Sequence, residues 1–261
     1  MILLDDKVVC PTSFPDGTLA LRVDVSSENN QKVIEWNYES DTEMVVLYYI
    51  TKHLKNAGFS VSLFMPYIPN ARMDRVKNSD EIFTLKYFAE FINSLGFETV
   101  YVRDPHSNVS CALFNNLKVD DGFKYIITAI GKINDKDLVM YYPDEGAMKR
   151  YSGMITDKPY AFGIKDRDWS SGDIRGIILM NEDVVKGKNV LIVDDICSKG
   201  GTFYYSAKAL KATGANDVYL YITHCENTIF KGELINSDLI KHIYTTKSVF
   251  TLAHEKITVL K

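Results

Sequence analysis

The stretch from residue 190 to residue 202 constrains the fold of this chain most tightly. Apolar residues 190–193 run directly into two adjacent carboxylates, Asp194 and Asp195, and a loop of small residues follows. A short apolar run that ends in a polar loop predicts a buried strand of a parallel sheet, with a helix beginning after the loop. Ligands bind at the carboxyl ends of such strands. This order of features predicts an α/β sheet with a binding loop at one edge.

The residues of this loop indicate what it binds. Gly200 and Gly201 let backbone N–H groups approach an anion at the start of the following helix, where the helix dipole also favours negative charge. Asp194 and Asp195 offer acceptors for the hydroxyl groups of a ribose. In a plainer interpretation, the two carboxylates only end a strand and cap a helix. The acidic pair, Gly-Gly-Thr and helix together favour a site for a phosphorylated sugar.

Strand and helix patterns alternate along the rest of the chain, which indicates mostly parallel α/β sheets. The expected strands are 61–64, 99–102, 138–142, 190–193 and 218–223. The expected helices are 44–57, 81–95, 146–151 and a segment after residue 202. Ser40 and Glu43 have capping-box spacing before the first helix, and Gly58 ends it.

The composition argues against two classes of function. With 30 basic and 34 acidic residues among 261, the chain lacks the positive surface of a general nucleic-acid-binding protein. It has no apolar run long enough to span a bilayer, and Asp5 and Asp6 stand where a signal peptide carries basic residues. The four cysteines are scattered without zinc-type pairing, as in a reducing compartment. We therefore expect a cytoplasmic protein with no nucleic acid and no membrane among its partners.

Two motifs together resemble one enzyme family. Residues 190–202 resemble the loop that binds phosphoribosyl pyrophosphate in phosphoribosyltransferases and in ribose-phosphate pyrophosphokinases. Residues 65–75, Met-Pro-Tyr-Ile-Pro-Asn-Ala-Arg-Met-Asp-Arg, resemble the Pro-Tyr-x-x-x-Ala-Arg-Gln-Asp-Arg signature of the pyrophosphokinases, which ordinary phosphoribosyltransferases lack. Further matches in register are Asp104-Pro105-His106, Tyr142-Pro143-Asp144, Lys165-Asp166-Arg167 and Ile222-Thr223-His224. The chain is thus similar to ribose-phosphate pyrophosphokinases over most of its length.

This resemblance implies a fold and a reaction. The fold is α/β, with two similar phosphoribosyltransferase-like domains, each a mostly parallel sheet flanked by helices. Residues 1–121 would form the ATP-side domain and residues 122–261 the domain with the ribose-phosphate-binding loop. The reaction is the Mg²⁺-dependent transfer of the diphosphoryl group of ATP to the anomeric hydroxyl of ribose 5-phosphate, which gives phosphoribosyl pyrophosphate and AMP. The resemblance also implies a homo-oligomer, a dimer or larger.

The resemblance assigns roles to individual residues as well. The family positions that bind ATP match Phe14, Asp16, Arg72, Asp74 and Arg75. Those that bind magnesium match His106 and Asp144, and the catalytic set matches Lys165, Arg167 and His106. The ribose-phosphate site matches Asp194, Asp195, Ser198, Lys199, Gly200, Gly201 and Thr202. Of the acidic pair, we expect Asp195 to face the sugar hydroxyls and Asp194 mainly to shape the loop.

Some of these residues have plainer interpretations. Arg72 and Arg75 would form a surface ion pair with Asp74, and His106 would be an ordinary hydrogen-bonded histidine at a strand end. Magnesium prefers oxygen ligands, so a lone histidine is a poor sign of it. The polar stretch 166–173, read as a mobile catalytic loop, would instead be a solvated charged loop.

The chain departs from the family pattern in three places. Thr18 stands where the family has glutamate, Met73 replaces a glutamine, and Ser198-Lys199 replaces Asp-Thr in the sugar-phosphate loop. The last exchange adds a cation and removes an anion, which suits an acceptor with more negative charge, such as ADP-ribose, whose product could feed nicotinamide nucleotide (NAD) salvage. Two further alternatives are a phosphoribosyltransferase and a non-catalytic regulatory homologue.

Overall fold

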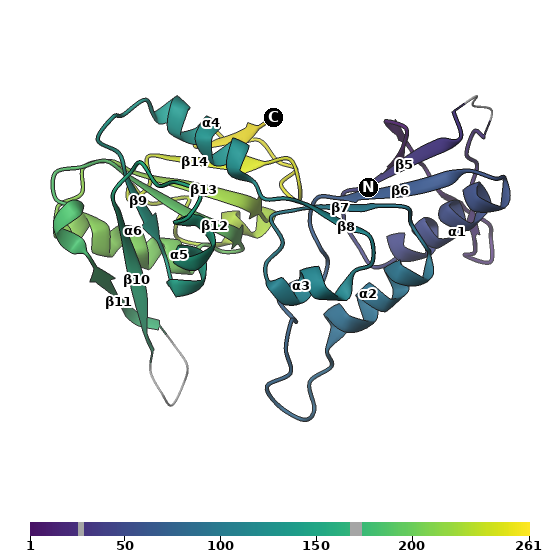
Figure 1. Ribbon diagram of the computed structural model, residues 1–261, viewed down its shortest axis with the longest axis horizontal. Coiled ribbons are helices and arrows are strands. Elements are labelled where there is room, and N and C mark those ends of the chain that lie inside the picture. The colour runs from purple at the N-terminus through teal and green to yellow at the C-terminus, as the bar shows by residue number, and fades with distance from the viewer. Residues whose placement is uncertain (26–28, 168–173) are drawn as a thin grey trace. The chain divides into compact units, whose positions relative to one another are not determined.

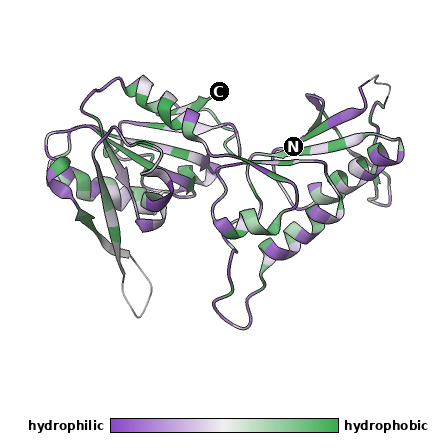
Figure 2. Cartoon of the chain, in the orientation of Figure 1, coloured by the Kyte–Doolittle hydropathy of each residue, from purple (hydrophilic) through white to green (hydrophobic). Residues whose placement is uncertain are grey.

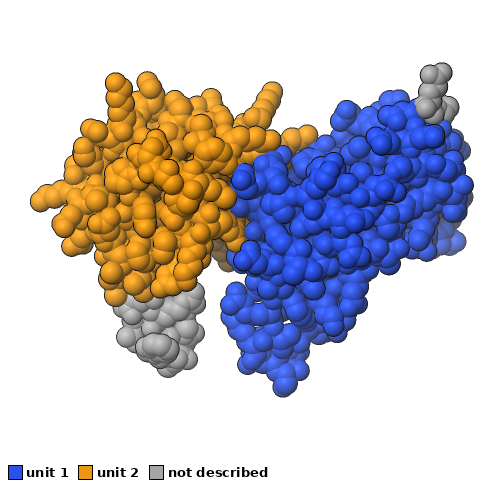
Figure 3. All heavy atoms as spheres, in the orientation of Figure 1, with its two compact units in different colours: residues 1–121 blue, residues 122–261 orange. Residues whose placement is uncertain are grey.

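The computed structural model describes residues 1–25, 29–167 and 174–261. These residues form two compact units, Met1–Asp121 and Gly122–Lys261, drawn in blue and orange in Figure 3. Each unit has its own sheet with helices beside it (Figure 1). Both sheets are mostly parallel, so the predicted fold class is confirmed. No helix of the described part is both long and apolar enough to cross a membrane.

The described part of the first unit contains a six-stranded sheet in the order β2-β1-β5-β6-β7-β8. Its strands are β1 (Ile2–Leu4), β2 (Lys7–Val8), β5 (Gln31–Trp36), β6 (Ser60–Met65), β7 (Val100–Arg103) and β8 (Leu117–Asp120). Strands β5 to β8 pair in parallel, whereas β1 and β2 are antiparallel. A separate antiparallel hairpin consists of β3 (Thr12–Ser13) and β4 (Leu19–Ala20).

The helices of the first unit are α1 (Glu43–Asn56), α2 (Thr84–Ser94) and α3 (Asn108–Leu113). The Glu43 carboxylate accepts the backbone N–H of Glu39 at 2.8 Å, which helps to fix where α1 begins. Helix α2 begins three residues later than the sequence predicts, because Glu81 belongs to a turn. The Glu81 carboxylate accepts the backbone N–H of Lys77 at 2.8 Å and the side-chain amide N–H of Asn78 at 3.0 Å.

The described part of the second unit contains a seven-stranded sheet in the order β11-β10-β9-β12-β13-β14-β15. Its strands are β9 (Val139–Tyr142), β10 (Tyr160–Arg167), β11 (Ile174–Met180), β12 (Val190–Cys197), β13 (Val218–Cys225), β14 (His242–Thr246) and β15 (Ile257–Leu260). Its helices are α4 (Phe123–Ile133), α5 (Glu145–Tyr151) and α6 (Gly201–Thr213), with 3-10 turns η1 (Glu182–Val184) and η2 (Asn227–Lys231). Only β10 and β11 pair antiparallel among the described strands of this sheet.

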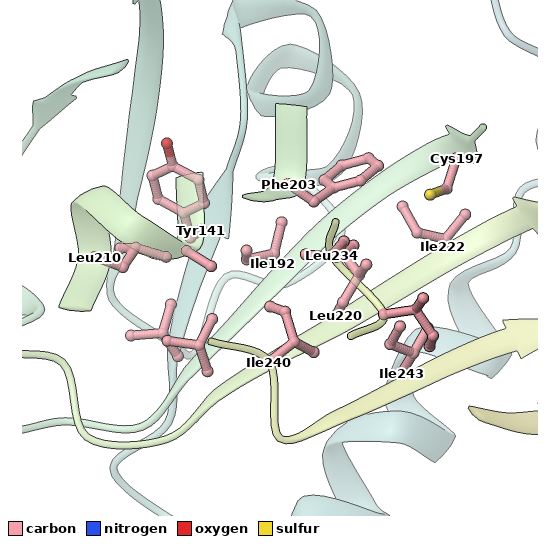
Figure 4. Close-up of a cluster of buried hydrophobic side chains, with 14 of the residues drawn as sticks. Tyr141, Ile192, Cys197, Phe203, Leu210, Leu220, Ile222, Leu234, Ile240 and Ile243 are labelled. Carbon is pink, nitrogen blue, oxygen red and sulfur yellow. The ribbon is translucent and has the colours of Figure 1, made fainter. Parts of the chain in front are cut away.

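The two central strands of the second unit, β12 and β13, are buried on both faces. On one face, Ile192 packs in a cluster with Phe203 and Leu210 of α6 (Figure 4). On the other face, Leu191 packs in a cluster with Ile126 of α4. Hydrophobic residues run along the strands of this sheet (Figure 2), and each fully buried apolar side chain contributes about 1.5 to 3 kcal/mol. This packing holds the carboxyl end of β12, where the acidic pair lies, in one place.

Candidate active site

The loop 198–202 connects β12 to α6 and has the geometry of an anion-binding site. Gly200 is the residue before α6 and has φ +80°, a left-handed conformation that favours glycine. No side chain of the described residues caps this helix. Gly201 is exposed and Thr202 is partly exposed. The first N–H groups of a helix have no partner within the helix, so α6 presents donors and a positive dipole end to a phosphate.

The two polar side chains at the start of this loop differ in their surroundings. The Ser198 hydroxyl donates to the Glu226 carboxylate at 2.7 Å. The side chain of Lys199 is exposed. The predicted loop residues therefore lie together in the structure, and Glu226 joins them although no sequence motif marks it.

Asp195 is buried and ion-paired. Its Oδ2 atom accepts from Nη1 of Arg150, in the last turn of α5, at 2.9 Å, and its Oδ1 atom accepts the backbone N–H of Ile196 at 2.9 Å. The Asp195 side chain is 7% exposed. Sequence reasoning missed Arg150, because a basic residue in the last turn of a helix is usually read as a solvated charge that complements the helix dipole.

Asp194 is more exposed than Asp195, and its surroundings disfavour a charged carboxylate. Its Oδ1 atom accepts the backbone N–H of Asp195 at 3.0 Å. Burial, and then the negative charges of Asp195 and Asp144, raise the pKa of Asp194 well above its usual value. A carboxyl group in this state is stabilised by a proton, a cation or hydroxyl donors from a ligand. A perturbed carboxyl beside an anion-binding loop is typical of a functional site.

Asp144 follows β9 and caps α5. Its Oδ1 atom accepts the backbone N–H of Ala147 at 3.0 Å. Within the described residues, no group of three or more His, Cys, Asp or Glu side chains is placed to hold a metal ion. Magnesium commonly takes one or two carboxylates and completes its shell with phosphate oxygens and water. The carboxylates of Asp144 and Asp194 thus fit a magnesium ion that a phosphorylated ligand helps to hold, and a closed protein cage is not indicated.

In the first unit, Asp74 of the 65–75 signature interacts with the turn that carries His106. His106 lies between β7 and α3, next to Ser107, whose hydroxyl caps α3. Asp74 is buried, and burial raises its pKa. Hydrogen bonds from Arg75 and Ser107 and the charges of Arg75 and His106 outweigh this effect and hold the pKa of Asp74 below its usual value. The structure therefore brings Asp74 and His106 close together.

The two arginines of the signature are exposed. Nε of Arg75 donates to the Asp74 carboxylate at 2.9 Å, so the ion pair of the plainer interpretation is present. The Arg75 side chain is nevertheless 68% exposed, and its guanidinium can still meet a ligand. Arginine's planar fork suits phosphate oxygens.

Phe14 and Asp16 lie in the turn between β3 and β4. The Asp16 carboxylate accepts both the hydroxyl of Thr18 at 2.7 Å and its backbone N–H at 2.9 Å. These bonds, the hydroxyl first, lower the pKa of Asp16. Phe14 is 57% exposed, so its ring is available for stacking. Thr18 therefore holds the turn through Asp16.

Lys165 and Arg167 lie near the end of β10. Their backbones pair with Ile177 and Ile174 of β11. The side chains of residues 165–167 and the whole of 168–173, the expected catalytic loop, lie outside the described residues.

This fold and loop define an α/β protein of phosphoribosyltransferase type. Residues 156–245 match the family model described as a phosphoribosyl transferase domain. The crystal structure of phosphoribosylpyrophosphate synthetase from Mycobacterium smegmatis has the same fold, with a TM-score of 0.77 and 19% sequence identity, and the match covers 97% of this chain and 85% of that one.

Sequence relatives narrow the class further. Ribose-phosphate pyrophosphokinase of Mycoplasma genitalium is 30% identical over 227 residues, covering 84% of this chain and 67% of that protein. Ribose-phosphate pyrophosphokinase of Sulfurisphaera tokodaii is 29% identical over 245 residues, covering 90% and 82%. The chain belongs to the ribose-phosphate pyrophosphokinase family and is an enzyme of the diphosphate-transferring type. The resemblance seen in the sequence motifs is confirmed.

Proposed function

We propose that this enzyme transfers the diphosphoryl group of ATP to the anomeric hydroxyl of ribose 5-phosphate, giving phosphoribosyl pyrophosphate and AMP. The 198–202 loop at the end of β12 carries this proposal, because it combines an uncapped helix start with an acidic pair. The first donors of α6 would bind the 5-phosphate. The family membership supports the same reaction, since the relatives are ribose-phosphate pyrophosphokinases.

The acidic pair would bind the ribose ring. Asp195 is already bonded to Arg150, whereas Asp194 is the more exposed and has a raised pKa. These surroundings favour Asp194 as the acceptor of ribose hydroxyl hydrogens and Asp195 as the support for the end of β12. This division of roles is the reverse of the one that we expect from sequence alone.

The first unit would bind ATP. Arg72 and Arg75 would hold phosphate oxygens, Asp74 would orient Arg75, and Phe14 and Asp16 would contact adenosine. The resemblance to the family implies His106 and Asp144 as ligands of Mg²⁺. When bound, this ion would neutralise charge on the transferring group.

Lys165 and Arg167 would supply the remaining positive charge at the transferring phosphorus. Diphosphoryl transfer needs little covalent participation from the protein, and its rate depends on holding two anionic substrates in line. Cations that act mainly in the transition state raise kcat more than substrate affinity.

The oligomeric state and the location of the protein stay predictions, namely a homo-oligomer and the cytoplasm.

The replacement of Asp-Thr by Ser198-Lys199 suggests a second acceptor, ADP-ribose. Lys199 is an exposed residue of the loop. Its charge would meet a second phosphate if the side chain turns towards the acceptor, whereas a side chain that points to solvent fits ribose 5-phosphate alone. In the first case, the anomeric hydroxyl of ADP-ribose would receive the diphosphoryl group, and the product could serve NAD salvage.

The test is to incubate the pure enzyme with ATP and Mg²⁺ and either ribose 5-phosphate or ADP-ribose, and to identify products by mass. We expect AMP together with a product one diphosphate heavier than the acceptor. AMP release without such a product, or no reaction with either acceptor, would contradict the proposal. A phosphoribosyltransferase would consume phosphoribosyl pyrophosphate and release no AMP from ATP. Replacement of Lys199 by Thr should shift the acceptor ratio towards ribose 5-phosphate if Lys199 selects ADP-ribose.

A further inference from the structure

Glu226 ties the 198–202 loop to the neighbouring strand. It follows β13 directly, and its Oε2 atom accepts the hydroxyl of Ser198 at 2.7 Å and that of Thr228 at 3.0 Å. Its backbone N–H donates to the carbonyl of Cys197 at 2.8 Å. One residue thus holds the beginning of the loop through both its backbone and its side chain.

The chain that follows Glu226 packs against the same loop. A Cβ atom on Gly232 would lie 1.8 Å from the carbonyl oxygen of Lys199, which leaves room for no residue but glycine. A Cβ atom on Gly200 would lie 2.8 Å from Leu234, a member of the buried cluster in Figure 4. The segment 226–234 therefore backs the loop from Ser198 to Gly200, and Glu226 is the charged residue at its start.

The hydrogen bond from Ser198 decides which groups of the loop face a ligand. Because the Ser198 hydroxyl donates to Glu226, its hydrogen is already engaged by a carboxylate and is not offered to a phosphate. Binding of a phosphate is then left to the backbone N–H groups of the loop and of α6. Their convergence depends on the backbone conformation that Glu226 fixes.

We propose that Glu226 is a positioning residue that sets the affinity of the 198–202 loop for the phosphorylated acceptor. This inference rests on the proposed function, in which that loop binds ribose 5-phosphate or ADP-ribose. Glu226 acts through Ser198, so its removal weakens acceptor binding and leaves ATP binding unchanged.

The first test measures binding of ribose 5-phosphate and of ADP-ribose by calorimetry without ATP. Glu226→Ala removes the acceptor of the Ser198 bond and should weaken binding about tenfold or more, since hydrogen bonds to charged groups are the stronger ones. Glu226→Gln keeps an acceptor oxygen and should stay within about threefold of wild type. Glu233→Ala, an exposed carboxylate of the same segment, is the matched control and should bind normally.

The second test asks whether the effects of replacing Ser198 and Glu226 depend on each other. If Glu226 acts through Ser198, Ser198→Ala combined with Glu226→Ala should bind no more weakly than the worse single variant. Ser198→Asp places a second carboxylate against Glu226 and should weaken binding more than Ser198→Ala does. Adding Glu226→Gln to Ser198→Asp should restore part of the affinity, because a glutamine amide can donate to a carboxylate.

The outcomes separate this inference from the proposed function. A wild-type protein that binds either acceptor but releases no AMP from ATP would contradict the proposed reaction, while the binding series still decides the role of Glu226. If Glu226→Ala lowers the melting temperature but binds both acceptors as wild type does, Glu226 is only structural and the inference is wrong. Additive effects of Ser198→Ala and Glu226→Ala, or a wild type that binds neither acceptor, would overturn it as well.

Discussion

The two units hold their candidate binding groups in different ways. In the second unit, Asp195 is buried against Arg150, and the 198–202 loop is backed by the segment 226–234. In the first unit, Arg72 and Arg75 are exposed. The acceptor loop is therefore supported by other parts of its unit, whereas a ligand would order the exposed arginine side chains further, at a cost of up to about 0.5 to 1.5 kcal/mol for each side chain.

Two carboxylates show the same contrast in their titration. Burial raises the pKa of both Asp74 and Asp194. Around Asp74, the bonds from Arg75 and Ser107 and nearby positive charge outweigh burial, and the net shift is downward. Around Asp194, the charges of Asp195 and Asp144 add to burial, and the shift is upward. The protein itself thus stabilises the charged carboxylate of Asp74. The surroundings of Asp194 disfavour its charged form, so this carboxyl group would be stabilised by donors or a cation from a ligand.

The largest effect is expected from the proposed catalytic cations. Lys165→Ala and Arg167→Ala should each lower kcat about a hundredfold or more while the KM for ATP changes little, because a contact made mainly in the transition state is typically worth about 3 to 4 kcal/mol. Steady-state kinetics with ATP and the preferred acceptor measures this split. Lys186→Ala, at an exposed position of the same unit, is the control. Near-normal kcat in both variants would remove these residues from the mechanism.

The next effect tests whether the second unit depends on its internal pairing. Arg150→Ala leaves the buried Asp195 carboxylate without its guanidinium and should lower the free energy of unfolding by about 3 kcal/mol. Arg75→Ala removes a guanidinium that is 68% exposed, and the buried Asp74 keeps its hydrogen bond from Ser107, so the melting temperature should shift by no more than about 2 °C. Urea titration and calorimetry of the two variants give the comparison. Equal losses of stability would show that the units do not differ in this way.

The sequence predicts local features of this site well and pairwise contacts poorly. The strand 190–193, the acidic pair and the Gly200-Gly201 turn can be predicted from the sequence. The spacing of apolar residues and the conformational freedom of glycine are local properties, which depend only on residues close together in the chain. The Arg150–Asp195 pair cannot be predicted in this way, since 45 positions separate its members. The Glu226–Ser198 bond spans 28 positions, and no motif contains Glu226. The different surroundings of Asp194 and Asp195 are equally hidden, because adjacent strand residues face opposite sides of a sheet and have different neighbours.

A smaller effect tests the opposite titration of Asp194 and Asp74. A raised folded pKa means that Asp194 favours the fold below its ordinary pKa of about 4, and that this contribution is lost as pH rises through the folded pKa. Asp194→Asn should therefore gain stability over wild type as the pH rises above this ordinary pKa. Thermal melts at several pH values measure the difference.

The control for this pH series is Asp74→Asn, for which the change in stability with pH should have the opposite sign. The lowered pKa of Asp74 gives stability that is present above its ordinary pKa and is lost as pH falls through the folded pKa. Asp74→Asn should lose stability relative to wild type near neutral pH and approach wild type in acid. Parallel pH profiles for the two variants would contradict the assigned shifts.

The smallest effect is expected in the exposed turn of the first unit. Thr18→Ala removes the hydroxyl that donates to Asp16 at 2.7 Å but keeps the backbone N–H bond at 2.9 Å. The pKa of Asp16 should rise part of the way towards its usual value, because the hydroxyl bond is the largest cause of its lowering. Carboxyl NMR titration measures this change, and the melting temperature should stay within about 1 °C of wild type because the turn is exposed. Thr12→Ala is the matched control, since its hydroxyl donates to Ala20 of the same hairpin and not to Asp16. An Asp16 pKa that is unchanged by Thr18→Ala, or equally changed by Thr12→Ala, would mean that Thr18 does not set the charge of this turn.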